Sequence, residues 1–199
     1  KPDLISFTGS FDTGMKIKSA TSSYSPKLIL EMGGSNPIIV CESADIKKAA
    51  TIIAESAISN SGQRCASASR LIVHDSISEE MMTLLEEKIT AMLDVNRRET
   101  FSGCLVDINA KNKHEDLLKK ARTSGSIVLE FDYEKSSEGC YVNPAIVLRN
   151  PKNSEATVEE VFSPILFAEN FETNQQALAK ANSTPYGLTA AIWTSDFYE

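Results

Sequence analysis

Apolar residues along the chain fall into two patterns, short runs and longer stripes at helical spacing. The clearest stripe begins at Ile46 and recurs every three or four residues through Ile58, which predicts one buried face of an α-helix. The short apolar runs predict strands, at residues 4–8, 28–32, 37–41, 70–74, 126–131, 141–148 and 164–171. Strands separated by helices of about 10–15 residues are typical of an α/β protein with a largely parallel sheet and flanking helices.

Helix starts are predicted by polar residues whose side chains can accept hydrogen bonds from the free N–H groups of the first helical turn. Ser76 and Glu79 stand at capping-box spacing before an apolar stripe. Thr173 and Gln176 suit the start of a helix that we expect to run through Ala181. Two further helices are expected, from about residue 12 and over 110–122.

The composition is that of a folded protein with an acidic surface. Hydrophobic residues make up 42% of the chain, enough for a packed core, and the formal net charge is −7. An acidic chain lacks the basic face that nucleic acids and anionic membranes require, so we expect neither as a partner. No apolar run approaches the roughly 20 residues of a membrane span, and no signal peptide is visible.

The four cysteines are widely spaced, and neither histidine stands near them in sequence. This spacing predicts no metal site. The composition favours reduced thiols and a cytoplasmic protein. The chain begins Lys-Pro-Asp without Met, so we expect its start to be a cut edge and not a natural terminus.

Cys65 lies in S-N-S-G-Q-R-C-A-S-A-S, where small and polar residues replace the Leu, Ile and Val that surround most buried cysteines. A thiol with a pKa near 8.5 is only about 3% thiolate at pH 7, so a nucleophilic cysteine needs a positive neighbour or free N–H groups. Arg64 supplies a charge, and a short helix over 66–68 would direct N–H groups toward the thiol. Composition alone leaves two interpretations, a reactive thiol and a small cysteine that only packs.

Two other stretches have the form of strand ends that bind ligands. Glu31 closes an apolar strand and precedes Gly33 and Gly34, which permit a sharp turn. A carboxylate at the carboxyl end of a parallel strand suits a general base, although an ordinary solvated acid has the same sequence. Gly9-Ser10 separates a strand from a helix and could bind a phosphate through helix N–H groups, and an ordinary strand-to-helix turn would look the same.

In chain order, five motifs are similar to those of the NAD(P)-dependent aldehyde dehydrogenase superfamily. The family pattern is F-T-G-S followed by a glycine, then E-L-G-G-x-x-P, G-Q-x-C, E-E-x-F-G-P and Y-G-L. This chain has F-T-G-S at 7–10 with Gly14, E-M-G-G-S-N-P at 31–37, G-Q-R-C at 62–65, E-E-V-F-S-P at 159–164 and Y-G-L at 186–188. The resemblance implies an α/β aldehyde dehydrogenase-like catalytic domain truncated at both ends, in which 1–30 end the cofactor-binding domain and 31–199 form the catalytic domain.

The resemblance also implies a reaction and the residues that perform it. The Cys65 thiolate would attack an aldehyde to form a thiohemiacetal, hydride would pass to NAD or NADP, and Glu31 would activate the water that hydrolyses the resulting thioester to a carboxylic acid. The Cys65 backbone N–H would be one oxyanion donor. Relatives that transfer the acyl group to coenzyme A usually lack the glutamate, so Glu31 favours hydrolysis. The cofactor-binding residues that the resemblance implies are Gly9, Ser10, Gly14, Met32, Gly33, Glu160 and Phe162.

The chain departs from the family pattern at a few positions. Met32 stands where Leu is commoner, and Cys104 follows Gly103 where the family has G-P. Ser163 replaces the glycine of F-G-P, which predicts a different bend in the ribose-contacting loop, because serine does not adopt a positive φ freely. The motifs cover less than half of a family member, so we expect an incomplete cofactor site here and a homodimer or homotetramer for the whole protein.

Two alternative functions stay open at this point. A catalytically silent relative with a binding or assembly role fits the change at Ser163, whereas the presence of Cys65, Glu31 and Glu160 together favours catalysis. An unrelated cysteine hydrolase would need a partner histidine, and none stands near any motif. Arg64 and the sequence E-M-G-G are similar to those of family members that act on semialdehydes. This similarity is the one indication of substrate class.

Overall fold

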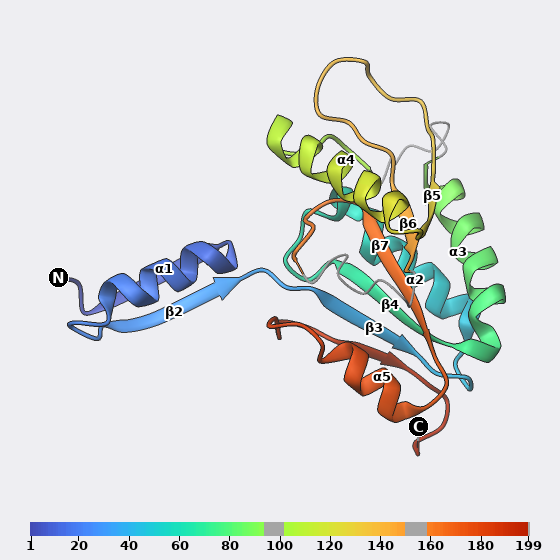
Figure 1. The fold of residues 1–199 in the computed structure, drawn as a ribbon, viewed down its shortest axis with the longest axis horizontal. Helices are drawn as coiled ribbons and strands as arrows, with labels where there is room; N and C mark the ends of the chain where they lie inside the picture. The colour runs from blue at the N-terminus through green and yellow to red at the C-terminus, as the bar shows by residue number, and fades with distance from the viewer. Residues whose placement is uncertain (94–101, 150–158, 199) are drawn as a thin grey trace.

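The computed structural model describes residues 1–93, 102–149 and 159–198. Within these ranges the chain forms a small arm, residues 1–32, and a larger body that contains the rest (Figure 1). The arm has two parallel strands, β1 (Leu4–Gly9) and β2 (Lys27–Met32), joined by α1 (Phe11–Thr21). Strand β2 leads directly into the first strand of the body, so a short stretch of backbone connects the two parts (Figure 1).

The body is built on a sheet of six strands in the described ranges, in the order β5-β6-β7-β4-β3-β8. These strands are β3 (Asn36–Val40), β4 (Ala68–His74), β5 (Ile127–Glu130), β6 (Ala145–Leu148), β7 (Ile165–Phe171) and β8 (Ala191–Trp193). Neighbouring strands are parallel except β5 and β6, which are antiparallel. The largely parallel α/β sheet expected from the sequence is therefore confirmed.

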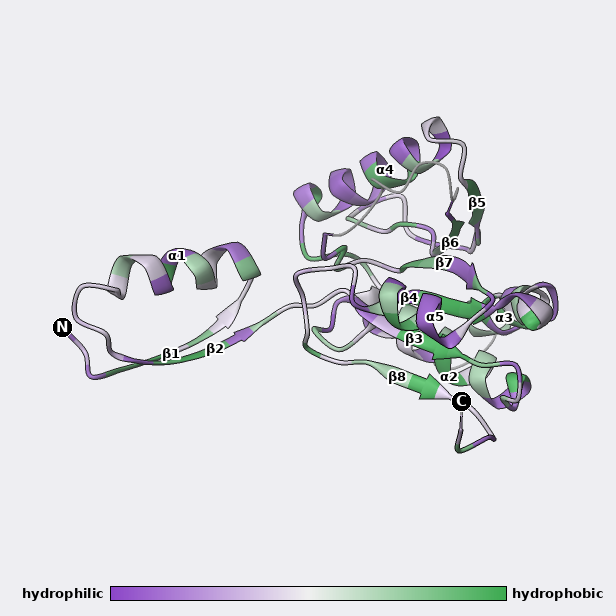
Figure 2. Cartoon of the chain, turned by 60° about the horizontal axis from the view of Figure 1, so that its bottom comes forward, coloured by the Kyte–Doolittle hydropathy of each residue, from purple (hydrophilic) through white to green (hydrophobic). Residues whose placement is uncertain are grey.

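Helices cover both faces of the large sheet. One face carries α2 (Ile46–Ile58) and α3 (Ser78–Met92), and the other carries α4 (Ile108–Thr123) and α5 (Asn174–Ala181). Along β3, Ile38 and Val40 pack on the α2 side while Ile39 packs on the α5 side, because successive side chains of a strand point to opposite faces. A sheet covered on both faces needs apolar residues at nearly every position, which explains the continuous apolar runs. Figure 2 shows hydrophobic strands in the body and a largely hydrophilic α4.

The caps of two helices test the predictions made from polar residues. Thr173 caps α5 as expected, because its hydroxyl accepts the N–H of Gln176. The prediction of a capping box at Ser76 is wrong. A 3₁₀ turn over 75–77 delays α3 to residue 78, and the Ser76 hydroxyl donates to Glu42 at 3.0 Å instead. The turn has its own cap, since His74 Nδ1 accepts the Ser76 N–H.

Two other local predictions are corrected by the structure. No helix forms over 66–68, because β4 already begins at Ala68 and pairs with β3. The strand expected over 141–148 is shorter, Ala145–Leu148, and β8 was not expected at all. Strand β8 has only three residues and two of them are exposed, so its sequence carries little of the apolar pattern that identified the other strands.

A buried arginine fixes the end of α5 to the sheet. The Arg70 guanidinium donates to the backbone carbonyls of Lys180 and Ala181, at 2.9 and 2.6 Å, and its Nε donates to the carbonyl of Ser35 at 3.1 Å. The last carbonyls of a helix lack intrahelical partners, and charged donors satisfy them well. Arg70 therefore holds the chain that follows α5 beside the start of β3.

Candidate active site

A cleft of about 410 Å³ opens where the arm meets the body. Every site residue predicted from the sequence except Gly14 lines it, namely Gly9, Ser10, Glu31, Met32, Gly33, Cys65, Glu160 and Phe162. Gly14 lies nearby in α1, buried against Met32, where any side chain would overlap the methionine sulfur. The fold thus brings residues of all five motifs to one cavity, and Leu188 represents the last of them, Y-G-L.

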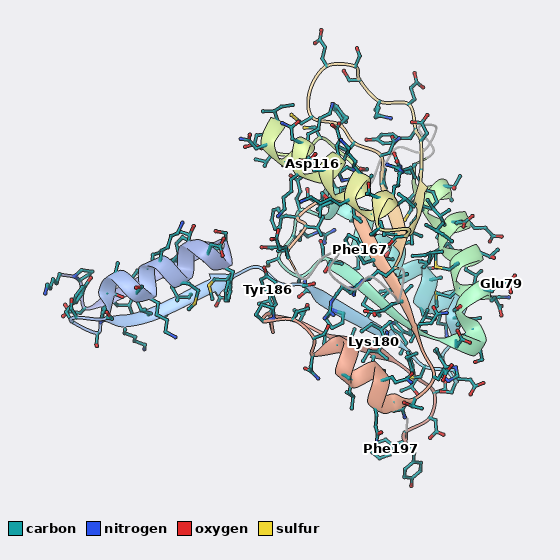
Figure 3. The ribbon with its side chains drawn as sticks, in the orientation of Figure 1. Glu79, Asp116, Phe167, Lys180, Tyr186 and Phe197 are labelled. Atoms are coloured by element: carbon teal, nitrogen blue, oxygen red, sulfur yellow. The ribbon has the colours of Figure 1, made fainter. Side chains whose placement is uncertain are left out.

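The cleft lies between the ends of the two sheets. Strands β1 and β2 end at Gly9 and Met32, so the arm presents its carboxyl ends to the cavity. Cys65 and Glu160 precede β4 and β7, so the body presents its amino ends. Open parallel sheets generally bind ligands at their carboxyl ends, and here only the arm follows that rule. Figure 3 shows Tyr186 at this junction between arm and body.

Cys65 is exposed within a tight turn in which the Ser67 N–H donates to the Arg64 carbonyl at 3.0 Å. The buried side chain of Asn36 holds this turn. Its Nδ2 donates to the carbonyls of Cys65 and Ser67, at 2.7 and 2.9 Å, and its Oδ1 accepts the Thr189 N–H at 3.3 Å. The backbone that carries the thiol is therefore tied to the first residue of β3.

The approach to Cys65 has a left-handed backbone at three consecutive residues. Asn60, Ser61 and Gly62 have φ values of 54°, 55° and 66°, a conformation that costs about 1–3 kcal/mol at each non-glycine residue. The Ser61 hydroxyl holds the turn by accepting the Gly103 N–H at 2.7 Å and donating to the Gly103 carbonyl at 2.8 Å. Gly62 has no room for a side chain, because a Cβ would lie 2.5 Å from the Ser163 carbonyl oxygen.

Glu160 reaches the cleft in close contact with the arm. Its carboxylate lies against Gly33, where any side chain would overlap it. Its backbone N–H donates to the Tyr186 hydroxyl at 3.3 Å, and its carbonyl accepts from Lys113 Nζ at 2.6 Å. Burial raises the pKa of the Glu160 carboxyl, and the charge of Lys113 and a hydrogen bond from the Gly34 backbone act in the opposite direction.

Phe162 has a φ of 53°, is 43% exposed and lines the cleft. The positive φ of this loop lies on Phe162 and not on Ser163, so the serine needs no left-handed conformation here. The different bend expected for the loop stays a prediction. Ser163 is buried, and its hydroxyl lies 3.1 Å from Nδ1 of His114. Serine fits here because its hydroxyl has a partner inside the protein.

Ser10 caps the helix that starts at the cleft. Its hydroxyl accepts the Thr13 N–H at 3.3 Å and donates to the Thr13 hydroxyl at 2.9 Å. The N-terminus of α1 therefore opens into the cavity, which is the geometry that phosphate binding at Gly9-Ser10 requires.

Three residues at the site were not found from the sequence: Asn36, Lys113 and His114. Asn36 stands inside the E-M-G-G-S-N-P motif, and that position was a usable signal. Lys113 and His114 belong to α4, and their partners Glu160 and Ser163 lie 47 and 49 residues away in sequence. No local pattern connects residues so far apart.

A larger cleft, of about 600 Å³, lies between α3 and the ends of β6 and β7. None of the predicted site residues lines it. Its central carboxylate is already paired, because Glu169 forms ion pairs with Arg149 at 3.2 Å and with Lys180 at 2.9 Å. We therefore take the smaller cleft as the candidate active site.

Burial lowers the pKa of the His114 imidazole to about 4, against a weaker opposite effect of a hydrogen bond to the Asn143 backbone. In the unfolded chain a histidine becomes protonated below about pH 6.5. The unfolded state therefore binds more protons between pH 6.5 and 4, and the folded state loses stability as the pH falls through that window. The loss reaches about 3 kcal/mol near pH 4.

Urea unfolding of the chain and of its His114→Leu variant, between pH 4 and 7.5, measures this effect. We expect the free energy of unfolding of the wild type to fall, relative to the variant, as the pH drops below 6.5. The other titrating groups, Glu160 among them, are common to both proteins and cancel in the difference. A difference that does not change with pH contradicts the prediction.

Within the described ranges, no group of three or more His, Cys, Asp or Glu side chains is arranged to hold a metal ion. In the same ranges, no helix combines the length and the apolar character needed to cross a membrane.

The fold and the cleft define a class of protein: a parallel α/β protein with an exposed cysteine and a glutamate at one cavity between two sheets. The sequence profile described as the aldehyde dehydrogenase family matches residues 1–199. The chain therefore belongs to the aldehyde dehydrogenase family, as the motifs indicated.

Individual relatives agree with this assignment. The chain is 34% identical to aldehyde dehydrogenase family 7 member A1 of Brassica napus, over 96% of this chain and 39% of that protein. It is 33% identical to the betaine aldehyde dehydrogenase of Bacillus subtilis strain 168, over 98% of this chain and 40% of that protein. An indole-3-acetaldehyde dehydrogenase of P. syringae, solved in complex with NAD+, has a similar fold, with a TM-score of 0.89 and 30% identity over 98% of this chain and 41% of that one. The chain thus spans about 40% of the length of these relatives.

Proposed function

We propose that this chain carries the catalytic centre of an NAD(P)-dependent aldehyde dehydrogenase, with Cys65 as nucleophile and Glu31 as general base. The observation that carries the proposal is the one cleft that holds both residues together with Ser10, Glu160 and Phe162. Family membership supports it, and so do relatives that are named as aldehyde dehydrogenases.

The same proposal divides the chain into two functional parts. Residues 1–30 are the end of a cofactor-binding domain, and residues 31–199 belong to the catalytic domain. The separate small sheet of the arm supports this division, since its two strands pair only with each other in the described ranges.

The residues at the cleft fit a dinucleotide. The N-terminus of α1, beside Ser10, offers N–H groups and the positive end of the helix dipole to a pyrophosphate. Gly33 leaves room for the Glu160 carboxylate, which can accept hydrogen bonds from ribose hydroxyls. The exposed ring of Phe162 offers an apolar surface to a nicotinamide. When bound, NAD(P)+ supplies the hydride acceptor for the oxidation.

The protein's own residues would perform the remaining steps. The Cys65 thiolate adds to the aldehyde carbon, a carbon–sulfur bond forms, and the Cys65 N–H donates to the oxyanion of the thiohemiacetal. Loss of hydride from that carbon leaves a thioester. Glu31 then takes a proton from water as the water attacks the thioester carbon, the carbon–sulfur bond breaks, and the carboxylic acid leaves with the thiolate restored. Asn36 fixes the turn from which the thiol acts.

We also propose a semialdehyde as the substrate class. Arg64 is exposed next to Cys65, and its guanidinium suits a carboxylate at the far end of the substrate. Two of the relatives above are named for other aldehydes, betaine aldehyde and indole-3-acetaldehyde, so Arg64 and the E-M-G-G sequence are the support for this choice.

Competitive thiol labelling tests the proposed nucleophile on the chain itself. With limiting iodoacetamide at neutral pH, we expect Cys65 to be modified well ahead of Cys41, Cys104 and Cys140. Cys104 is the matched control, because its side chain is also exposed but does not line the cleft. Labelling in which Cys104 reacts as fast as Cys65 would count against an activated thiol. NAD(P)H formation by the complete protein with a panel of aldehydes and semialdehydes then tests the reaction and its substrate class.

A further inference from the structure

Two consecutive residues of α4 hold the segment that contains Glu160 and Phe162. Lys113 Nζ donates to the Glu160 carbonyl at 2.6 Å, and His114 Nδ1 lies 3.1 Å from the Ser163 hydroxyl. The lysine contact is exposed to solvent, whereas His114 and Ser163 are both buried. Water competes for the first contact and not for the second, so the His114–Ser163 bond is the firmer attachment.

The surroundings of His114 keep the imidazole that makes this bond neutral. A hydrogen bond to the Asn143 backbone favours the protonated form, but the effect of burial is larger. Burial lowers the pKa of His114 to about 4, so the imidazole is neutral at pH 7 and has a single N–H. Each neutral tautomer can make the 3.1 Å bond between Nδ1 and the Ser163 hydroxyl, because the hydroxyl can either donate or accept.

The bond lies next to the strained residue of the cleft. A bulky residue such as Phe162 keeps a φ of 53° only where its surroundings hold it. Immediately after it, Ser163 is bound by its hydroxyl to His114, and its carbonyl accepts the Ile165 N–H at 2.7 Å. Just before it, the N–H of Glu160 is bound to the Tyr186 hydroxyl. The backbone is thus fixed on both sides of Phe162.

We propose that His114 and Ser163 are positioning residues, whose buried hydrogen bond keeps Phe162 in its left-handed conformation and so presents Phe162 and Glu160 to the cofactor. The expected effect on the KM for the cofactor rests on the proposed function, whereas the expected effect on amide exchange in this segment does not. The two consequences therefore have separate tests.

Hydrogen–deuterium exchange of the 199-residue chain tests the structural consequence. Ser163→Ala and His114→Leu each remove the bond, and we expect the amides of Glu160 and Ile165 to exchange about tenfold faster in both. His114→Asn keeps a hydrogen-bonding group near the position of Nδ1 and is expected to restore part of the protection. The control is Leu85→Ala, which removes buried contacts of α3 on the opposite face of the sheet and is expected to leave those two amides unchanged relative to the rest of the sheet.

Steady-state kinetics of the complete protein test the consequence for the cofactor. Ser163→Ala is expected to raise the KM for NAD(P)+ about tenfold while the KM for the aldehyde stays unchanged. The double variant with His114→Leu should be no worse than either single variant, because both remove the same bond.

Unchanged exchange at Glu160 and Ile165 overturns the proposal, and so does an unchanged KM for the cofactor in an active protein. A wild-type protein that reduces no NAD(P)+ with any aldehyde overturns the proposed function instead. In that case the exchange experiment alone decides whether His114 and Ser163 hold the segment.

Discussion

Replacing Cys65 by serine is expected to lower aldehyde-dependent NAD(P)H formation by the complete protein at least about 10³-fold. A serine hydroxyl stays protonated at neutral pH and needs an adjacent base to attack a carbonyl, whereas a thiol is a strong nucleophile once it is deprotonated. The backbone around residue 65 is held by Asn36 through carbonyl contacts, so the substitution leaves the turn intact. The measurement is the initial rate at saturating aldehyde and cofactor.

Cys104→Ser is the matched control for this experiment. Cys104 is also exposed, and its backbone carbonyl, not its thiol, contacts the neighbouring loop by accepting a hydrogen bond from Gln63. We expect this variant to keep the wild-type rate. A Cys65→Ser protein with a rate near that of Cys104→Ser would remove Cys65 from the reaction.

Replacing Glu31 by glutamine is expected to separate the two halves of the reaction. The first turnover, which forms the thioester and one NAD(P)H per site, needs no general base for water, so a stoichiometric burst remains. Steady-state turnover falls about 10²–10⁴-fold, because an amide cannot take the proton of the attacking water. Rapid mixing with absorbance detection measures both phases in one trace.

Two comparisons make the Glu31 experiment specific. Hydroxylamine attacks a thioester without help from a base, so it should restore turnover in Glu31→Gln and change the wild type little. Glu159→Gln makes the same chemical change at an exposed acid that does not line the cleft, and should behave as wild type. Loss of the burst in Glu31→Gln would instead give the glutamate a role before the thioester.

Much of the fold could be predicted because its signals are local. The stripe from Ile46 to Ile58 became α2, whose inner face is buried from Ala49 to Ile58. Thr173 could be identified as a cap because the bond it makes spans only three residues. The Ser76 capping box failed for the opposite reason. Its serine bonds Glu42, a partner 34 residues away that no local pattern reveals.

The candidate site shows the same limit. Ordered motifs identified the residues that the fold collects around Cys65 and Glu31, although their chemical roles stay predictions. The sequence predicted a different bend at Ser163, but it did not reveal the positive φ of Phe162 or the buried partner of Ser163, His114. Such pairs follow from how α4 packs on the sheet, and that packing depends on the whole chain.

The proposed nucleophile precedes a strand of the body, and the proposed base lies at the end of a strand of the arm. The backbone at 33–35 links the two sheets, and Phe11 of the arm also contacts Tyr186 of the body. On the proposed mechanism, the body would carry out the carbon–sulfur chemistry and the tip of the arm would determine what receives the acyl group. Substitutions near Glu31 would then exchange water for another acyl acceptor, while Asn36 and the left-handed residues 60–62 still hold the cysteine turn. The junction between the two sheets is therefore the place where substitutions would change the acyl acceptor without altering the backbone that holds Cys65.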